Sequence, residues 1–385
     1  MSKNKFTAFT NDITELIYNT TNKRTQIISG DSDSLLIQTL KETAPFSKVV
    51  FVATSKSYVK CVKKIFSLIR EANCVPLGMT IEDYGVYNIE RVAELFALPD
   101  DVRAVVSVDS SLSKVISYFA GLRGIPHVSV VLGRDIDGVL DDTFFVKCGG
   151  ALNRVQGNAE QIILIDDKII ECVHGGEDSA HLIVKNITAL YDYRLKAVLD
   201  GAITNKGGYA LIKSGIIDYV TACLSGDNEQ SLQAQIKMQV GNVISNGEIY
   251  DNSAYEQYNM LYKAIGCGGT DCYSHVGRRV YSLYKSVQTR IVKGHDTIDL
   301  TEIEQASNVL GIDRSELFRA RTSYYRRYNI KYGKLLSFAQ AVEKEIKQNM
   351  EILTALAIEQ KLEVEDKLID RAVKYFPYGY NLLKI

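Results

Sequence analysis

The stretch at positions 101–138, DVRAVVSVDSSLSKVISYFAGLRGIPHVSVVLGRDIDG, restricts the fold of this chain more than any other. It contains an apolar strand, a polar turn, a helix and a second apolar strand that ends at Val131. Continuous apolar strands are typical of a parallel sheet covered on both faces, and ligands bind at the carboxyl ends of such strands. We therefore expect a small-molecule site near Asp109 to Ser111 and near the loop at 133–138, which contains Asp137.

The same pattern of strand and helix precedes this stretch. Residues 1–24 are polar with one short amphipathic segment, and an apolar strand then leads to Asp33 and Ser34, either of which would cap the next helix. Repeated units of this length predict an α/β fold with a mainly parallel sheet and right-handed crossovers. The expected strands are 25–29, 48–54 and 75–79, and the expected helices end near 43, 72 and 96.

The pattern changes after residue 160. Two apolar runs within 161–173 flank Asp166 and Asp167, which predicts a β-hairpin. The sequence HGGED at 174–178 is the expected joint between two domains, because apolar residues recur at helical spacing beyond it. We predict a Rossmann-like α/β domain at 1–177, an all-helical domain at 178–385, and a cleft between them.

The charge balance restricts the partners. The 385 residues include 45 basic and 46 acidic side chains, which gives a formal net charge of -1. A chain without net basic charge is not expected to bind nucleic acid, and no apolar run approaches the roughly 20 residues that cross a membrane. The N-terminus lacks a secretory signal pattern and the seven cysteines form no C-x-x-C pair, so we expect a cytoplasmic protein with reduced cysteines.

Three stretches resemble one enzyme superfamily. They are AVVSVDSSLSKVISYFAGLRGIPHVSV at 104–130, RDIDGVLDD at 134–142 and AVLDGAITNKGGYALIKSGIIDYV at 197–220. Together they are similar to iron-containing alcohol dehydrogenases, glycerol and glycerol-1-phosphate dehydrogenases, and dehydroquinate synthases. The resemblance implies a dehydroquinate synthase-like fold, in which a Rossmann-like nucleotide-binding domain precedes a helical domain that holds metal and substrate.

The resemblance also implies a set of site residues. Asp218 falls on the family's metal-binding aspartate, His275 falls near the second ligand, and His295 is the candidate for the third. One carboxylate and two imidazoles suit Zn²⁺ or Fe²⁺, with open positions where a substrate oxygen is polarised. Asp137 would orient a substrate hydroxyl. The implied chemistry is hydride transfer between a polyol or polyol phosphate and NAD(P).

The turn that would bind the dinucleotide differs from the family pattern. Glycines there let backbone N–H groups approach the diphosphate at a helix N-terminus. This chain has Val108, Asp109 and Ser110 at those positions, and only Ser111 matches. A carboxylate at Asp109 would repel a diphosphate, which disfavours NAD(P) binding in the family's manner. Asp109, Ser110 and Ser111 would then either bind another ligand or cap the helix that starts at Leu112.

Each remaining site residue also has a structural interpretation. Asp218 would cap the turn after Ser214-Gly215, His275 would form a hydrogen bond at the domain interface, and His295 would lie on the surface. Asp137-Gly138 would make a tight turn. The basic and aromatic stretch at 314–334 would grip a phosphate or a partner, or form an amphipathic helix with solvated tips.

Two classes of function follow. The leading hypothesis is a divergent NAD(P)- and metal-dependent polyol or polyol-phosphate dehydrogenase. The alternative is a non-redox relative, which is either an inactive protein that binds a sugar phosphate or nucleotide or serves as a scaffold, or a dehydroquinate synthase-like sugar-phosphate cyclase. The expected partner is a polyol or sugar phosphate, and a homodimer is the assembly state to test.

Overall fold

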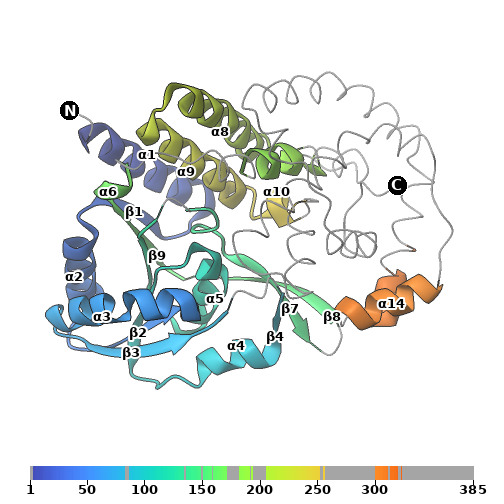
Figure 1. Ribbon diagram of the computed structural model, residues 1–385, viewed down its shortest axis with the longest axis horizontal. Coiled ribbons are helices and arrows are strands. Elements are labelled where there is room, and N and C mark those ends of the chain that lie inside the picture. The colour runs from blue at the N-terminus through green and yellow to red at the C-terminus, as the bar shows by residue number, and fades with distance from the viewer. Residues whose placement is uncertain are drawn as a thin grey trace.

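The computed structural model describes most of the first 251 residues and short segments beyond them (Figure 1). The described residues are 3–82, 86–133, 136–148, 151–157, 159–170, 182–190, 192–193, 205–251, 255, 300–310, 313–319 and 322. No helix among these residues is both long and apolar enough to cross a membrane. The structure places a parallel sheet with helices on both faces beside a group of helices, which confirms the predicted fold class.

Six parallel strands form the main sheet. Their order across the sheet is β1-β9-β6-β5-β2-β3. The strands are β1 (Thr25–Gly30), β2 (Lys48–Ala53), β3 (Val75–Thr80), β5 (Val102–Ser107), β6 (His127–Val131) and β9 (Gln161–Asp166). Every residue of β6 and β9 is buried, as expected for the centre of a sheet covered on both faces.

Helices cover both faces of this sheet. On one face, α2 (Ser32–Thr43) and α3 (Ser55–Glu71) pack on alternate residues of the strands, including Phe51, Val106 and Leu164. On the other face, α4 (Ile89–Phe96) and α5 (Ser113–Arg123) pack on residues such as Val50 and Val105. The cap of α2 differs from the prediction, which was Asp33 or Ser34. The N-cap is Asp31, whose side chain accepts from the Ser34 backbone N–H at 3.1 Å.

The N-terminal segment is more helical than the sequence indicated. Helix α1 spans Lys3–Thr21, 19 residues, where a short amphipathic segment was predicted. Its apolar residues Phe6, Ile13 and Ile17 lie on one side and are buried. They pack with Ile27 of β1 and with residues of α9 (Asn228–Ile244), so α1 joins the sheet to the helical part of the chain.

The predicted hairpin at 161–173 is wrong. Residues Gln161–Asp166 form β9, which pairs in parallel with β1 on one edge and with β6 on the other. Both edges of β9 are therefore occupied, and no antiparallel partner can be added. Helix α6 (Asp167–Ile170) follows directly, and the Asp166 carboxylate accepts from the Lys168 backbone N–H at 2.9 Å.

A second, smaller sheet was not predicted. It contains β4 (Val86–Asn88), β7 (Thr143–Cys148) and β8 (Ala151–Gln156) in the order β4-β7-β8. Strands β7 and β8 are antiparallel, whereas β4 is parallel to β7. The rings of Tyr87 and Phe144 meet edge to face, with their centroids 5.6 Å apart. Both rings belong to the apolar cluster that also contains the buried residues of α5.

The described part of the second half is helical, as predicted. It contains α8 (Lys206–Ser225), α9, α10 (Glu248–Asp251) and α14 (Leu300–Leu310), together with helical residues at 182–190. Helices α8 and α9 lie beside α1 in Figure 1. The boundary between domains at residues 177 and 178 falls in a segment outside the described residues and stays a prediction.

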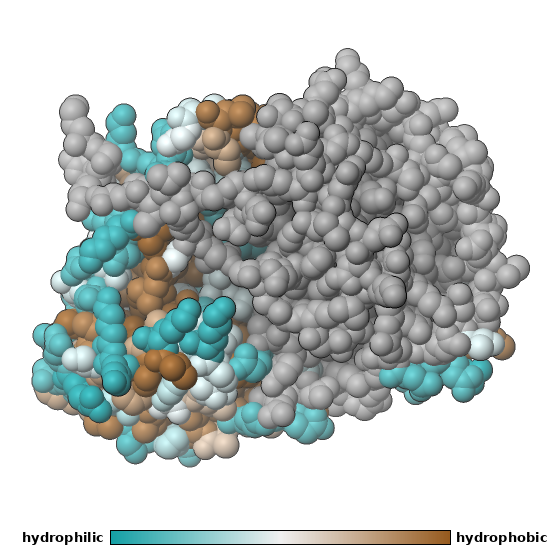
Figure 2. Space-filling model, in the orientation of Figure 1, coloured by the Kyte–Doolittle hydropathy of each residue, from teal (hydrophilic) through white to brown (hydrophobic). Residues whose placement is uncertain are grey.

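The exposed surface of the first part is mixed in polarity. Figure 2 shows hydrophilic and hydrophobic residues side by side over the region where α3 lies in Figure 1. The exposed side of α3 carries Lys60, Lys63 and Lys64 around Val59, which is 78% exposed. A solvated lysine face with single apolar residues is ordinary for a surface helix and indicates no particular partner.

Helices α8 and α9 approach each other through glycines. A Cβ added at Gly208 would lie 2.5 Å from the backbone oxygen of Gly241, and one added at Gly241 would lie 2.7 Å from that of Gly208. Gly207, the neighbour of Gly208, has more room, because its Cβ would meet only the Asn205 side chain, at 3.6 Å. The close approach therefore depends on Gly208 and Gly241.

We predict that Gly208→Ala lowers the free energy of unfolding by about 1–3 kcal/mol, because the added methyl group forces the two helices apart. Gly207→Ala, one position earlier in the same helix, is the matched control and should leave stability unchanged or raise it slightly. Urea unfolding followed by circular dichroism measures both. Equal effects of the two variants would contradict the close packing of α8 and α9.

His127 is a buried titratable group in the centre of the sheet. Its Nε2 lies 2.8 Å from the Ser107 hydroxyl, and its Nδ1 is buried without a hydrogen-bond partner. Burial lowers the pKa of His127 from its ordinary value of 6.5 to about 3. The unfolded chain binds a proton here below about pH 6.5, and the folded chain does so only near pH 3, so protonation favours unfolding between these values.

We predict that His127 makes the protein less stable as the pH falls from 6.5 toward 3. The contribution to the free energy of unfolding should decrease by up to about 1.4 kcal/mol per pH unit. The measurement is urea unfolding at pH 7.5, 6, 5 and 4 for the native protein and for His127→Phe, which cannot titrate. A stability difference between the two proteins that does not change with pH would show that His127 is not buried in its neutral form.

Candidate functional site

At one point in the main sheet, the helices that follow two adjacent strands lie on opposite faces of the sheet. Strand β2 continues through α3 to β3 on one side, and β5 continues through α5 to β6 on the other. In open α/β sheets a ligand crevice lies at such a point, outside the carboxyl ends of the strands. Asp109 lies two residues after Ser107, the last residue of β5, so the structure places this predicted residue at that point of the sheet.

Asp109 connects the end of β5 to the start of α3. Its Oδ2 accepts from the Thr54 backbone N–H at 2.7 Å, and its Oδ1 accepts from the Ser57 hydroxyl at 2.5 Å. The neighbouring Ser55 backbone N–H donates to the Glu82 carboxylate at 2.9 Å. Asp109 makes no side-chain cap bond to the short helix η1 (Ser110–Leu112) that follows it. The carboxylate therefore binds the N-terminus of α3, whose N-cap is Thr54, and does not cap the helix predicted from the sequence.

Ser110 and Ser111 lie in η1 and are partly exposed. The loop at 136–140 covers the adjacent start of α5. The buried Ser113 hydroxyl donates to the Val139 backbone oxygen at 2.7 Å. Gly138 has φ +84, and a Cβ added there would lie 3.5 Å from the Ser110 backbone oxygen. Asp137-Gly138 thus forms a turn, as predicted, and this turn sits against η1.

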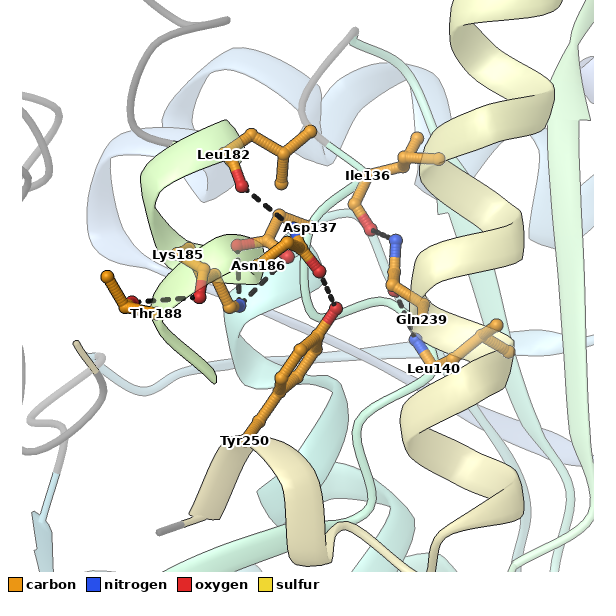
Figure 3. A network of polar contacts seen from close by, with 9 residues as sticks. All are labelled: Ile136, Asp137, Leu140, Leu182, Lys185, Asn186, Thr188, Gln239 and Tyr250. Carbon is orange, nitrogen blue, oxygen red and sulfur yellow. Dashed lines mark hydrogen bonds and ion pairs between the residues drawn. The ribbon is translucent and has the colours of Figure 1, made fainter. Parts of the chain in front are cut away.

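Asp137 is paired with a lysine that the sequence did not identify. Its Oδ2 and Oδ1 accept from Lys185 Nζ at 2.8 and 3.0 Å (Figure 3). The Lys185 side chain is only 4% exposed and that of Asp137 14%. The Lys185 ammonium also lies 4.7 Å from the centre of the Tyr250 ring, which is a cation–π distance. The Tyr250 hydroxyl in turn donates to the Asn186 side-chain oxygen.

Helix α9 holds the other side of the same loop. Gln239 donates from Nε2 to the Ile136 backbone oxygen at 2.7 Å and accepts from the Leu140 backbone N–H at 3.2 Å (Figure 3). Gln239 is buried, so both bonds are shielded from water. The loop is therefore fixed between α5, α9 and the helical residues 182–190. The Asp137–Lys185 pair lies where the α/β part meets the helical part.

The sequence contained a weak signal for this network. The segment HLIVKNITAL at 181–190 is apolar except for a few residues, and Lys185 and Asn186 stand in its middle. A lysine within an apolar helical run is rarely buried unless it is paired, so such a residue predicts a partner. That partner is Asp137, which lies 48 residues earlier in the chain. Only the structure identifies it.

Asp218 lies inside α8 and is paired with Lys237 of α9. Its Oδ2 accepts from Lys237 Nζ at 2.7 Å, and the Asp218 side chain is 37% exposed. The cap of α8 is Asn205, which accepts from the Gly208 backbone N–H at 2.9 Å. The alternative interpretation of Asp218 as a helix cap is therefore wrong. The ammonium beside its carboxylate opposes a second cation at the same oxygen.

The predicted metal site cannot be assembled from the residues that the structure describes. His275 and His295 lie outside them. Within the described residues, no group of three histidine, cysteine or acidic side chains is placed to hold a metal ion. Asp218, the member of the set that is described, faces Lys237. The set of Asp218, His275 and His295 therefore stays a prediction, of which the structure describes Asp218 alone.

The crevice does not fit the diphosphate of a dinucleotide. The carboxylates of Asp109 and Glu82 already accept from the first N–H groups of α3, and both would repel a phosphate. The loop at 136–140 takes the space against Ser110 and Ser113 at the start of α5.

Of the basic and aromatic stretch at 314–334, residues 314–319 are helical, and Arg314 lies 4.0 Å from Glu304 of α14.

Comparisons with known proteins support the fold. No protein-family model matches the chain, and no curated protein matches it by sequence. Among solved structures, an archaeal halo-thermophilic alcohol dehydrogenase from a Red Sea brine pool superposes with a TM-score of 0.56 at 13% identity, covering 93% of this chain and 91% of that one. An iron-containing alcohol dehydrogenase from Thermotoga maritima superposes with a TM-score of 0.51 at 11% identity, covering 92% and 91%.

A glycerol dehydrogenase from Schizosaccharomyces pombe covers 86% of this chain and 91% of its own, with a TM-score of 0.48 at 14% identity. The first two superpositions confirm the predicted resemblance at the level of fold. The chain therefore shares the fold of these two solved structures.

We predict that Lys185→Met lowers the free energy of unfolding by about 3–5 kcal/mol, because it leaves the Asp137 carboxylate buried without its ammonium partner. Lys237→Met is the matched control, since it removes the lysine of the more exposed pair with Asp218 and should cost less than about 1 kcal/mol. Thermal and urea unfolding measure both. Similar losses in the two variants would contradict the different burial of the two pairs.

Proposed function

We propose that this protein binds a polyol or polyol phosphate at the Asp137–Lys185 pair. The observation that carries the proposal is the contact of this carboxylate with this ammonium at 2.8 and 3.0 Å, where the α/β part meets the helical part. The pair lies beside the loop at the carboxyl edge of the sheet, which is the edge where α/β proteins of this type bind small molecules.

The chemistry of the pair suits a polyhydroxylated ligand. A carboxylate accepts hydrogen bonds from hydroxyl groups, and an ammonium donates to hydroxyl or phosphate oxygens. Both groups are largely shielded from water, which strengthens charge-assisted hydrogen bonds. A ligand with a hydroxyl next to a phosphate would engage both members, with the hydroxyl on Asp137 and the phosphate on Lys185.

The surrounding residues would keep both groups in place during binding. The ring of Tyr250 lies against the Lys185 ammonium, and Asn186 holds the Tyr250 hydroxyl. Gln239 fixes the backbone of the loop on both sides of Asp137. Such fixed orientation lowers the entropy that a ligand must lose on binding. The pair would therefore orient a hydroxyl group in one direction.

A second candidate is an NAD(P)- and metal-dependent dehydrogenase that acts on the same ligand class. The superposition on two alcohol dehydrogenases favours it. Asp218, with His275 and His295, would hold the Zn²⁺ or Fe²⁺ that polarises the substrate oxygen in this candidate. The pairing of Asp218 with Lys237 and the carboxylates at the crevice make it the weaker of the two.

We predict that the protein binds glycerol 1-phosphate more tightly than glycerol, and that inorganic phosphate competes with it. Isothermal titration calorimetry would measure these ligands with the native protein, Asp137→Asn, Lys185→Gln and the control Lys237→Gln. Asp137→Asn should weaken the hydroxyl contact, and Lys185→Gln the phosphate contact, each by at least about tenfold. Lys237→Gln should bind as the native protein does.

Folding of each variant is checked by circular dichroism before titration. Unchanged affinity in both Asp137→Asn and Lys185→Gln would rule out the proposed site. The dehydrogenase candidate is tested separately, by following NAD(P)H formation from glycerol and glycerol 1-phosphate with added Zn²⁺ or Fe²⁺. Turnover that Asp218→Ala abolishes would establish the second candidate in place of the first.

A further inference from the structure

We infer that the crevice between β2 and β5 is closed to dinucleotides, because the chain's own groups occupy both helix starts that flank it. This inference does not depend on the ligand proposed for the Asp137–Lys185 pair.

The first occupied position is the start of α3. A helix N-terminus attracts anions because its first N–H groups lack partners within the helix. In this chain the N–H of Thr54 donates to Asp109 and the N–H of Ser55 donates to Glu82, at 2.7 and 2.9 Å. The Ser57 hydroxyl donates to Asp109 as well, at 2.5 Å. Two of the first N–H groups at this helix start are therefore satisfied by carboxylates from outside the helix, and the Ser57 N–H is satisfied by the Thr54 hydroxyl at 3.3 Å.

The charge of Asp109 is directed toward α3. Burial and the nearby Asp109 carboxylate raise the pKa of the Cys61 thiol, which lies one turn after Ser57 on the same helix. A negative group that enters the crevice would meet this carboxylate and that of Glu82 together. Like charges at such short range repel strongly where water is partly excluded.

The second occupied position is the start of α5. The loop at 136–140 lies against it, with the Ser113 hydroxyl bonded to Val139 at 2.7 Å and Gly138 close to the Ser110 backbone. Gln239 of α9 holds the same loop from the far side. The space against η1 and α5 is thus filled by a loop that is itself fixed. Both ends of the crevice are closed by the chain, one by charge and one by packing.

The experiment compares NADH and ADP binding by the native full-length protein with that of Asp109→Asn and Asp109→Ser. Asp109→Asn removes the charge and keeps the shape, and Asp109→Ser removes both. NADH fluorescence and calorimetry with ADP should show no saturable binding to the native protein at millimolar concentration. Asp109→Ser should bind ADP saturably, at least about tenfold more tightly than the detection limit set by the native protein, and Asp109→Asn should fall between the two.

Asp31→Ser is the matched control. Asp31 also caps a helix at the carboxyl end of a strand, since it accepts from the Ser34 N–H, but it lies at β1, at the far edge of the sheet. Its replacement should leave the response to NADH and ADP unchanged. This control separates a general effect of removing a carboxylate beside a helix start from removal of the carboxylate at the crevice.

Hydrogen exchange of the peptide that contains Thr54 to Ser57 gives a readout that needs no ligand. Amide exchange of this peptide should be at least about tenfold faster in Asp109→Ser than in the native protein, and unchanged in Asp31→Ser. Saturable micromolar binding of NADH to the native protein would overturn the inference. An Asp109→Ser variant with native exchange and no gain in ADP binding would overturn the role assigned to Asp109.

Discussion

The insertion of β9 between β1 and β6 is the contact on which the rest of the structure depends. It brings residues 161–166 beside residues 25–30, with Gly30 opposite Asp166 and Val131 opposite Ile165. The aligned register places the carboxyl ends of these strands at one edge. The Asp166 carboxylate then accepts from the Ser32 hydroxyl at 2.6 Å, which joins the end of β9 to the start of α2. This arrangement also places α1 where α9 can pack on it.

The sequence predicted the repeated strand and helix units because each has a local signal. An apolar run of five or six residues, a polar turn and an amphipathic helix follow one another near β2 and β5. It failed at 161–173, because a buried central strand and one half of a hairpin have the same apolar pattern. It also missed β7 and β8, although Gly149-Gly150 between two apolar segments was a signal for a hairpin.

The sequence alone identified the acidic residues of the candidate site, but it did not identify the groups that donate to them. Asp109, Asp137 and Asp218 were all singled out from the sequence, and the structure gives each one a donor elsewhere in the chain. These donors, the Thr54 N–H, Lys185 and Lys237, lie 55, 48 and 19 residues away. Local patterns carry no information about contacts at such separation. The sequence therefore left each carboxylate either as a ligand-binding group or as a cap or turn residue, whereas in the structure each carboxylate accepts from a distant group of the chain.

The crevice and the Asp137–Lys185 pair are connected through the loop at 136–140. This loop carries Asp137, and its next residues contact Ser110 and Ser113 at the start of α5. Because Gln239 fixes the loop backbone on both sides of Asp137, a ligand that displaces this carboxylate must also strain the contacts with α5. The packing that closes the crevice is thus the same packing that orients the pair. In this chain, the contacts that hold Asp137 in place are therefore the same contacts that bring the loop against the start of α5.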